Sequence, residues 1–150
     1  MKFTIDEIIA GWLNVTFDFG ESVYCIMATD IHKTDSAYQL MEMAYNALKN
    51  DGEYYAVLDN EPGAWVIMLL GTGKAAVYLS REDLFGKAEL DGCDLAFEAQ
   101  TDVYAFAEQI YMAFEKYSEG DGLAEYENEW MPFPHELFNK LGYALGKTEK

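Results

Sequence analysis

The chain has 150 residues, which fits a single domain that buries about 68–70% of the surface exposed by its unfolded form. Its hydrophobic content of 51% argues against disorder, and its net charge of −17, from 27 acids and 10 bases, argues against nucleic acid and anionic membranes as partners. No apolar run is long enough to span a membrane, and acids at positions 6 and 7 interrupt any signal peptide, so we expect a cytoplasmic protein.

The first thirty residues predict a hairpin. Residues 4–7 (TIDE) have capping-box spacing, so this segment is either a short helical turn or a leading strand. Apolar and polar side chains then alternate over residues 13–19, which predicts a half-buried strand. Residues 20–22 (GES) predict a turn, and residues 23–29 a second strand with less regular alternation.

A first helix is predicted after residue 35. Residues 36–39 (SAYQ) form a second capping box, and apolar side chains recur at helical spacing up to Leu48. Residues 50–52 (NDG) predict its end, because Asn and Gly tolerate a left-handed backbone. Met41 and Met43 suit either an adaptable binding surface or the core, and the core is the commoner place for methionine.

Residues 53–80 predict three consecutive antiparallel strands. The unbroken apolar run at 64–70 (AWVIMLL) is typical of a strand covered on both faces. Residues 61–64 (EPGA) predict a type II turn before this strand, and residues 71–74 (GTGK) predict the next hairpin. Residues 75–80 then form the third strand.

The second half predicts an edge strand at 94–99 and a long amphipathic helix. Thr101 is the expected cap, with Asp102 in the first turn. The expected buried face is Val103, Phe106, Ala107, Ile110, Tyr111, Phe114 and Tyr117. Residues 118–122 end this helix, and Pro132 and Pro134 prevent a continuous helix over residues 123–134.

A last helix is predicted at residues 135–145, followed by a frayed tail at 146–150. These elements predict one α+β domain over residues 1–150. Its mostly antiparallel sheet is expected to have about five to six strands, with two to three helices packed mainly on one face.

The sequence lacks a catalytic or metal-binding signature. His32 and His135 are expected to be exposed, and Cys25 and Cys93 to be reduced, half-buried thiols, with no spacing typical of a zinc site. The glycines at 71 and 73 lack the remainder of a phosphate-binding loop. We therefore expect no enzyme activity, no cofactor and no metal.

Several pieces of the sequence carry a family resemblance. They are Trp12, the Glu61-Pro62-Gly63 turn with Trp65, Tyr126, Trp130, the Phe133-Pro134 pair, Leu137 and Leu141. In their order, the chain resembles small acidic bacterial proteins that look like immunity proteins of polymorphic or contact-dependent toxin systems. The resemblance implies a protein that neutralises a toxin by binding it, and it supplies no set of functional residues.

Charge and resemblance together predict a basic protein partner, such as a cognate toxin domain whose active site or substrate path is occluded. Residues 89–136 hold thirteen acids and one lysine, Lys116. The predicted partner-binding residues are Glu119, Asp121, Glu125, Tyr126, Glu127, Glu129 and Trp130. In this hypothesis the carboxylates steer association and the two aromatic residues anchor the complex. The alternative is that Tyr126, Trp130 and Phe133 attach this segment to the core.

Two other functional classes stay open. Secretion-type chaperones are also small acidic α+β proteins, but they dimerise and bind extended segments, whereas we expect this chain to be a monomer. A small-molecule enzyme would need a concave pocket with converging polar groups and a perturbed ionisable residue.

Overall fold

The computed structural model describes residues 1–148. Residues 149–150 of the predicted frayed tail lie outside this part. Its elements are β1 (Lys2–Ile9), β2 (Trp12–Asp18), β3 (Val23–Thr29), α1 (Ser36–Lys49), β4 (Glu53–Asp59), β5 (Ala64–Leu70), β6 (Lys74–Ser80), β7 (Asp94–Gln100), α2 (Val103–Glu115), α3 (Gly120–Glu129) and α4 (His135–Ala144).

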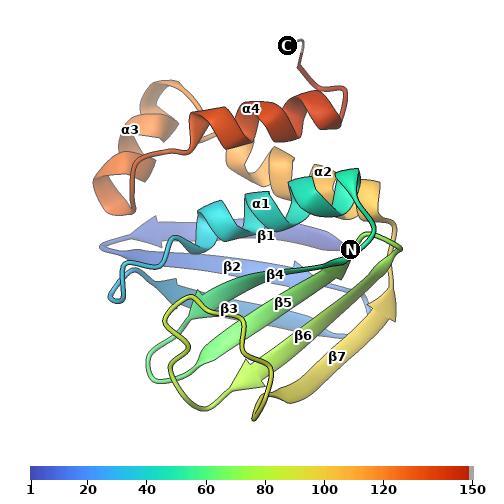
Figure 1. Ribbon diagram of the computed structural model, residues 1–150. Coiled ribbons are helices and arrows are strands. Elements are labelled where there is room, and N and C mark those ends of the chain that lie inside the picture. Colours follow the sequence, from blue (N-terminus) through green and yellow to red (C-terminus); the bar gives the residue numbers. More distant parts are fainter. Residues whose placement is uncertain (149–150) are drawn as a thin grey trace.

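The strands form two antiparallel sheets, one of order β1-β2-β3 and one of order β4-β5-β6-β7. The α+β class is confirmed. The expected single sheet is wrong, because the strands form two sheets, and the expected five to six strands and two to three helices are too few, because residues 1–148 contain seven strands and four helices. Figure 1 shows the helices gathered on one side of the strands, above the place where the two sheets meet.

Residues 4–7 belong to the leading strand β1, so the alternative of a helical turn is wrong there. Their pattern departs from strict alternation because a bulge between Ile5 and Glu7 shifts the register. After the bulge, Ile8 again points to the core, so both sides of the irregularity contribute buried side chains. The hairpin to β2 turns at Ala10 and Gly11, which both have positive φ.

The apolar run of β5 is covered on both faces, as predicted. Ile67 and Leu69 belong to the main core under the helices. Val66 belongs to a second cluster with Val57, and Leu84 packs against it from the connection between β6 and β7. The preceding turn has the predicted positive φ at Gly63, and the Glu61–Pro62 peptide bond is cis.

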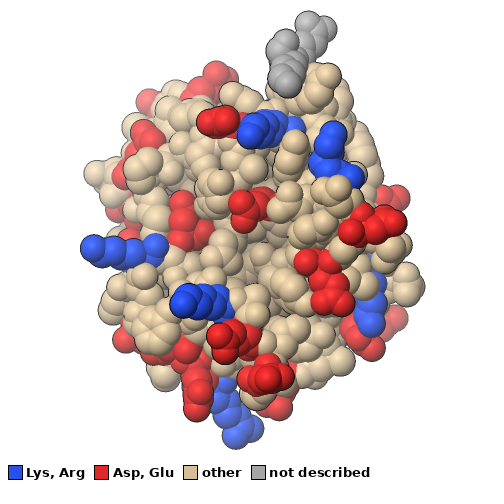
Figure 2. All heavy atoms as spheres, viewed as in Figure 1, with Lys and Arg blue, Asp and Glu red and all other residues tan. Residues whose placement is uncertain are grey.

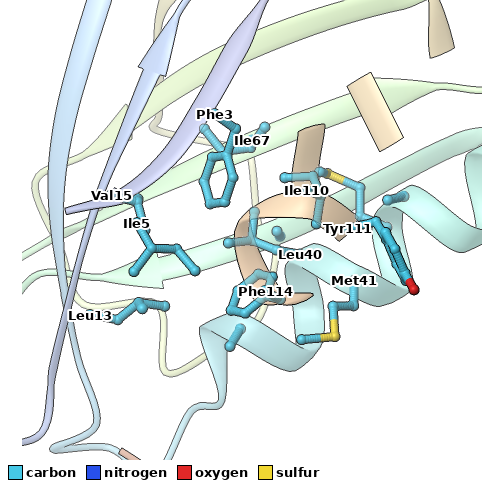
Figure 3. Packing of buried hydrophobic residues seen from close by; sticks show 14 of the residues in the cluster. Phe3, Ile5, Leu13, Val15, Leu40, Met41, Ile67, Ile110, Tyr111 and Phe114 are labelled. Carbon is cyan, nitrogen blue, oxygen red and sulfur yellow. The ribbon is translucent and has the colours of Figure 1, made fainter. Parts of the chain in front are cut away.

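Helices α1 and α2 fill the space above both sheets. Figure 3 shows Leu40 and Met41 of α1 and Phe114 of α2 converging with Phe3 of β1 and Ile67 of β5. Met41 and Met43 are both buried, which confirms their interpretation as core residues. The apolar stripe of the α2 sequence also faces this core, as predicted.

Aromatic side chains join the two sheets at their far ends. The Tyr24 ring of β3 lies 5.7 Å from the Trp65 ring of β5, and its hydroxyl donates to the Ala96 carbonyl of β7 at 3.3 Å. Phe19 packs on Phe97 with ring centroids 4.7 Å apart. These contacts fix the first sheet relative to the second away from the helices.

Both long helices are capped by aspartates rather than by the predicted residues. Asp35, not Ser36, caps α1 by accepting from the Tyr38 N–H at 3.0 Å. Ser36 lies inside the helix, and its hydroxyl donates to the Val57 carbonyl at 2.9 Å. Asp102, not Thr101, caps α2.

Helix α3 was not predicted, because the prolines at 132 and 134 argued against a helix in this region. The prolines follow the helix, which ends at Glu129, so the two features are compatible. The α3 helix is tied to α1 through one side chain, since the Trp130 indole N–H donates to the Asp35 carboxylate at 3.1 Å.

We predict that Asp35→Ala destabilises the fold more than Asp102→Ala, by at least about 1 kcal/mol. Both variants lose a helix cap, worth about 0.5–2 kcal/mol, but only Asp35→Ala also leaves the Trp130 N–H without its acceptor. Urea unfolding of the two variants measures the difference, and equal losses would show that the Asp35–Trp130 contact contributes nothing.

Candidate functional site

The predicted partner-binding residues lie on α3 and its C-terminal cap. Tyr126 is fully buried and Trp130 is 7% exposed, so both side chains pack in the core instead of facing a partner. The Tyr126 ring lies between those of Tyr117 and Phe133, at centroid distances of 6.0 and 5.1 Å. The interpretation that these aromatic residues attach the segment to the core is therefore the one the structure supports.

The five predicted carboxylates differ in what they contact. Glu127 accepts from the Phe133 N–H at 2.9 Å, and Glu129 accepts from the Ala10 N–H at 3.4 Å. The remaining three are exposed, and in residues 1–148 their carboxylates have no hydrogen bond or ion pair: Glu119, Asp121 and Glu125. Asp121 and Glu125 lie one turn apart on α3 and Glu119 is its N-cap residue; the three together are called the acidic face of α3, and their carboxylates make no polar contact with other side chains of residues 1–148.

Basic side chains do little to neutralise this region. Lys116, the one lysine between residues 89 and 136, lies over the Tyr117 ring at 5.0 Å from its centroid. Figure 2 shows acids spread over the viewed face with fewer basic residues between them. The negative potential is therefore broad, and α3 is one exposed part of it.

The connection between β6 and β7 encloses a pocket of about 620 Å³. Its lining includes six charged residues: Arg81, Glu82, Asp83, Lys87, Glu89 and Asp91. The lining contains no serine–histidine or cysteine–histidine pair that could act as a nucleophile and base. Charged residues alone do not identify a reaction here.

His32 lies beside this connection and is less exposed than predicted, with 18% of its side chain accessible. Its Nε2 is 3.5 Å from the Asp83 carboxylate and 3.8 Å from that of Glu61, and its ring packs on Phe85 at 4.4 Å. Asp83 also accepts from the Gly63 N–H at 2.7 Å. His32 thus helps to attach the segment before α1 to the β4–β5 turn.

Asp59, at the end of β4, is fully buried, and neither of its carboxylate oxygens has a hydrogen-bond partner in the described part of the chain. Among residues 1–148, however, no three His, Cys, Asp or Glu side chains are arranged to hold a metal ion. His135 is exposed, as expected, and Cys93 is half-buried, whereas Cys25 is exposed and so differs from the prediction.

The outer face of the β1–β3 sheet was missed by sequence analysis. It carries Val23 and Met27, which are 54% and 52% exposed, with Cys25 between them and Ile9 at its far end. The irregular alternation of residues 23–29 could have indicated it. A strand with apolar side chains on both faces exposes one apolar face to solvent when only the other face is covered by the core.

No protein family, curated protein or solved structure shows significant similarity to the chain. Within residues 1–148, no helix combines the length and hydrophobicity needed to cross a membrane. The case for a function therefore depends on the chain's own residues.

We predict that Tyr126→Phe leaves the protein as stable as the original at neutral pH, or more stable by about 1 kcal/mol. The buried Tyr126 hydroxyl has no hydrogen-bond partner within residues 1–148, so removing it removes a desolvation cost. Urea unfolding measures the change, and a loss above about 1 kcal/mol would mean that the hydroxyl makes a stabilising contact.

The same variant has a distinct pH dependence. Burial, followed by the negative charges of Asp35 and Glu127, raises the pKa of Tyr126. Above about pH 10 the unfolded chain loses this proton while the folded chain keeps it, so the free energy of unfolding falls as pH rises. Tyr126→Phe lacks this contribution, and its advantage over the original protein should grow above pH 10.

Proposed function

We propose that this chain is a non-catalytic binding protein that neutralises a basic protein domain, in the manner of bacterial immunity proteins. The observation that carries the proposal is the acidic face of α3: Glu119, Asp121 and Glu125 are exposed and unpaired on a helix fixed to the core. A net charge of −17 and the family resemblance of the sequence support the same proposal.

The acidic face is costly for the isolated protein. Asp121, Glu125 and Glu129 follow one another at intervals of four residues, and each such like-charge pair destabilises a helix by about 0.2–0.5 kcal/mol. The helix dipole favours Asp121 in the first turn, but no basic residue lies in the last turn of α3. Glu125 takes part in both pairs and makes no polar side-chain contact within residues 1–148, so its cost to folding supports a role in binding.

Tyr126 and Trp130 make the acidic face rigid. Because both side chains are buried and Trp130 is bonded to Asp35, the helix is held in place before a partner arrives. A preorganised surface loses less conformational entropy on binding. Complementary charge then accelerates encounter with a cationic domain, and occlusion of its active site or substrate path requires no chemistry from this chain.

The first test is co-expression and light scattering with the product of the neighbouring gene. The proposal predicts that this chain is a monomer alone, forms a stable complex with that product and protects cells from it. Failure to protect cells, with no complex detected, would contradict the proposal.

The second test reverses the charge of the acidic face. We predict that the variant Glu119→Lys, Asp121→Lys, Glu125→Lys slows association with that partner roughly tenfold or more at low salt. The control Glu42→Lys, Asp51→Lys, Asp91→Lys changes the net charge equally at other exposed positions and should slow it less than about threefold. Stopped-flow kinetics compares the two, and equal rates would place the interface elsewhere.

A further inference from the structure

Three sheet edges are covered in whole or in part by side chains. On β1, the Phe3 N–H donates to Gln109 of α2 at 3.1 Å. On β4, the Val57 N–H donates to Gln39 of α1 at 2.8 Å, and its carbonyl accepts from Ser36. On β7, the Ala96 carbonyl accepts from Tyr24. The remaining edge strand, β3, comes close to β4 of the second sheet but is not hydrogen-bonded to it.

Two hydrogen bonds show how the β3 backbone is oriented. The Phe19 N–H donates to the Ser22 carbonyl at 2.9 Å, and the Asp30 N–H donates to the Gly11 carbonyl at 2.9 Å. In an antiparallel ladder, every second residue bonds to the neighbouring strand, so residues 24, 26 and 28 face β2. The N–H and carbonyl groups of Val23, Cys25 and Met27 therefore point away from the sheet.

Within residues 1–148, no other strand is hydrogen-bonded to this side of β3. The same three residues, Val23, Cys25 and Met27, place their exposed side chains on the outer face of the sheet. Open backbone groups beside exposed apolar side chains are the features that let an extended chain add to a sheet.

The free side of β7 is less suitable. Its exposed residues include the charged Glu98, which is paired with Lys74 at 2.8 Å, and a bulge interrupts its ladder near Ala96. Charges and bulges are devices that keep edge strands from pairing. Strand β3 has no charged residue.

Charge identifies the kind of segment that fits β3. Three acids lie close to the ends of β3, namely Asp18 and Glu21 at its start and Asp30 directly after its last residue, whereas Asp6 and Glu7 lie on β1, on the other side of β2. Asp18 lies directly opposite Val23 in the sheet. A cationic segment gains from these charges, whereas a second copy of this chain, with its own net charge of −17, is repelled.

We propose that β3 is a docking strand, alongside which an extended cationic segment of another polypeptide adds as a fourth strand of the β1–β3 sheet. Apolar side chains of the segment lie beside Val23, Cys25 and Met27, and its basic side chains meet the surrounding acids. The inference goes beyond the proposed function, because it does not use α3 and does not require the partner to be a toxin.

The test uses a capped peptide of alternating lysine and valine, about eight residues long, which is the length of a typical strand. Binding is followed by amide hydrogen exchange and by the reactivity of the exposed Cys25 thiol. The proposal predicts exchange at the Cys25 and Met27 amides that is roughly tenfold slower with the peptide, and a slower thiol reaction. A peptide of alternating glutamate and valine should have neither effect.

Two exposed methionines provide a matched pair of variants. Met27→Lys should weaken peptide binding about tenfold, whereas Met112→Lys, at an equally exposed position on α2, should change it less than about twofold. Met27→Pro removes the outward N–H and should abolish binding, and if it does not fold, Met27→Lys remains decisive. The charge reversal at Glu119, Asp121 and Glu125 should leave peptide binding unchanged, which separates this inference from the proposed function.

Three results would overturn the inference. One is the absence of lysine–valine peptide binding, and another is protection that appears at Glu98 and Gln100 of β7 instead of at β3. The third is a dimer in light scattering that becomes covalent through Cys25, which would show that a second copy occupies the edge.

Discussion

Uncompensated negative charge is the constraint on which the other features of this protein depend. Twenty-seven acids face ten bases, and within residues 1–148 only three lysines pair with carboxylates: Lys74, Lys140 and Lys147. Self-repulsion of this kind opposes the compact state, although it favours solubility. The fold must therefore obtain its stability from packing.

Packing of this kind stabilises α3, which carries several of the acids. Helix α3 exposes carboxylates on one side and buries Tyr126 on the other, and the Trp130 that caps it reaches Asp35 at the start of α1. Two of its glutamates hold backbone N–H groups of neighbouring segments. These contacts hold the helix in place, and its outer surface, which is the proposed binding surface, stays exposed.

Local patterns predicted much of this fold. The apolar run at 64–70 and the stripe of α2 each depend on neighbours in the sequence, and each matches the structure. The predicted helix caps are each one residue from the observed ones, because serine and threonine are also good N-cap residues. Only the structure shows that the Ser36 hydroxyl donates to the Val57 carbonyl instead of capping α1.

Long-range features could not be predicted in the same way. The division into two sheets depends on contacts such as Tyr24 with Ala96, which lie 72 residues apart. The burial of Tyr126 and Trp130 depends on how α3 folds back on the core, whereas exposure is the usual state of carboxylates such as Glu119, Asp121 and Glu125. For this reason the carboxylates of the predicted interface are at the surface and its aromatic residues are not.

The most direct test of the central claim is the dependence of folding stability on salt. Between about 0.01 M and about 1 M NaCl the Debye length falls from about 30 Å to about 3 Å, so repulsion between surface carboxylates is screened. If the acidic exterior is uncompensated, the free energy of unfolding by urea should rise steadily over this range. A stability that falls with added salt would show that internal ion pairs dominate, and would contradict the account.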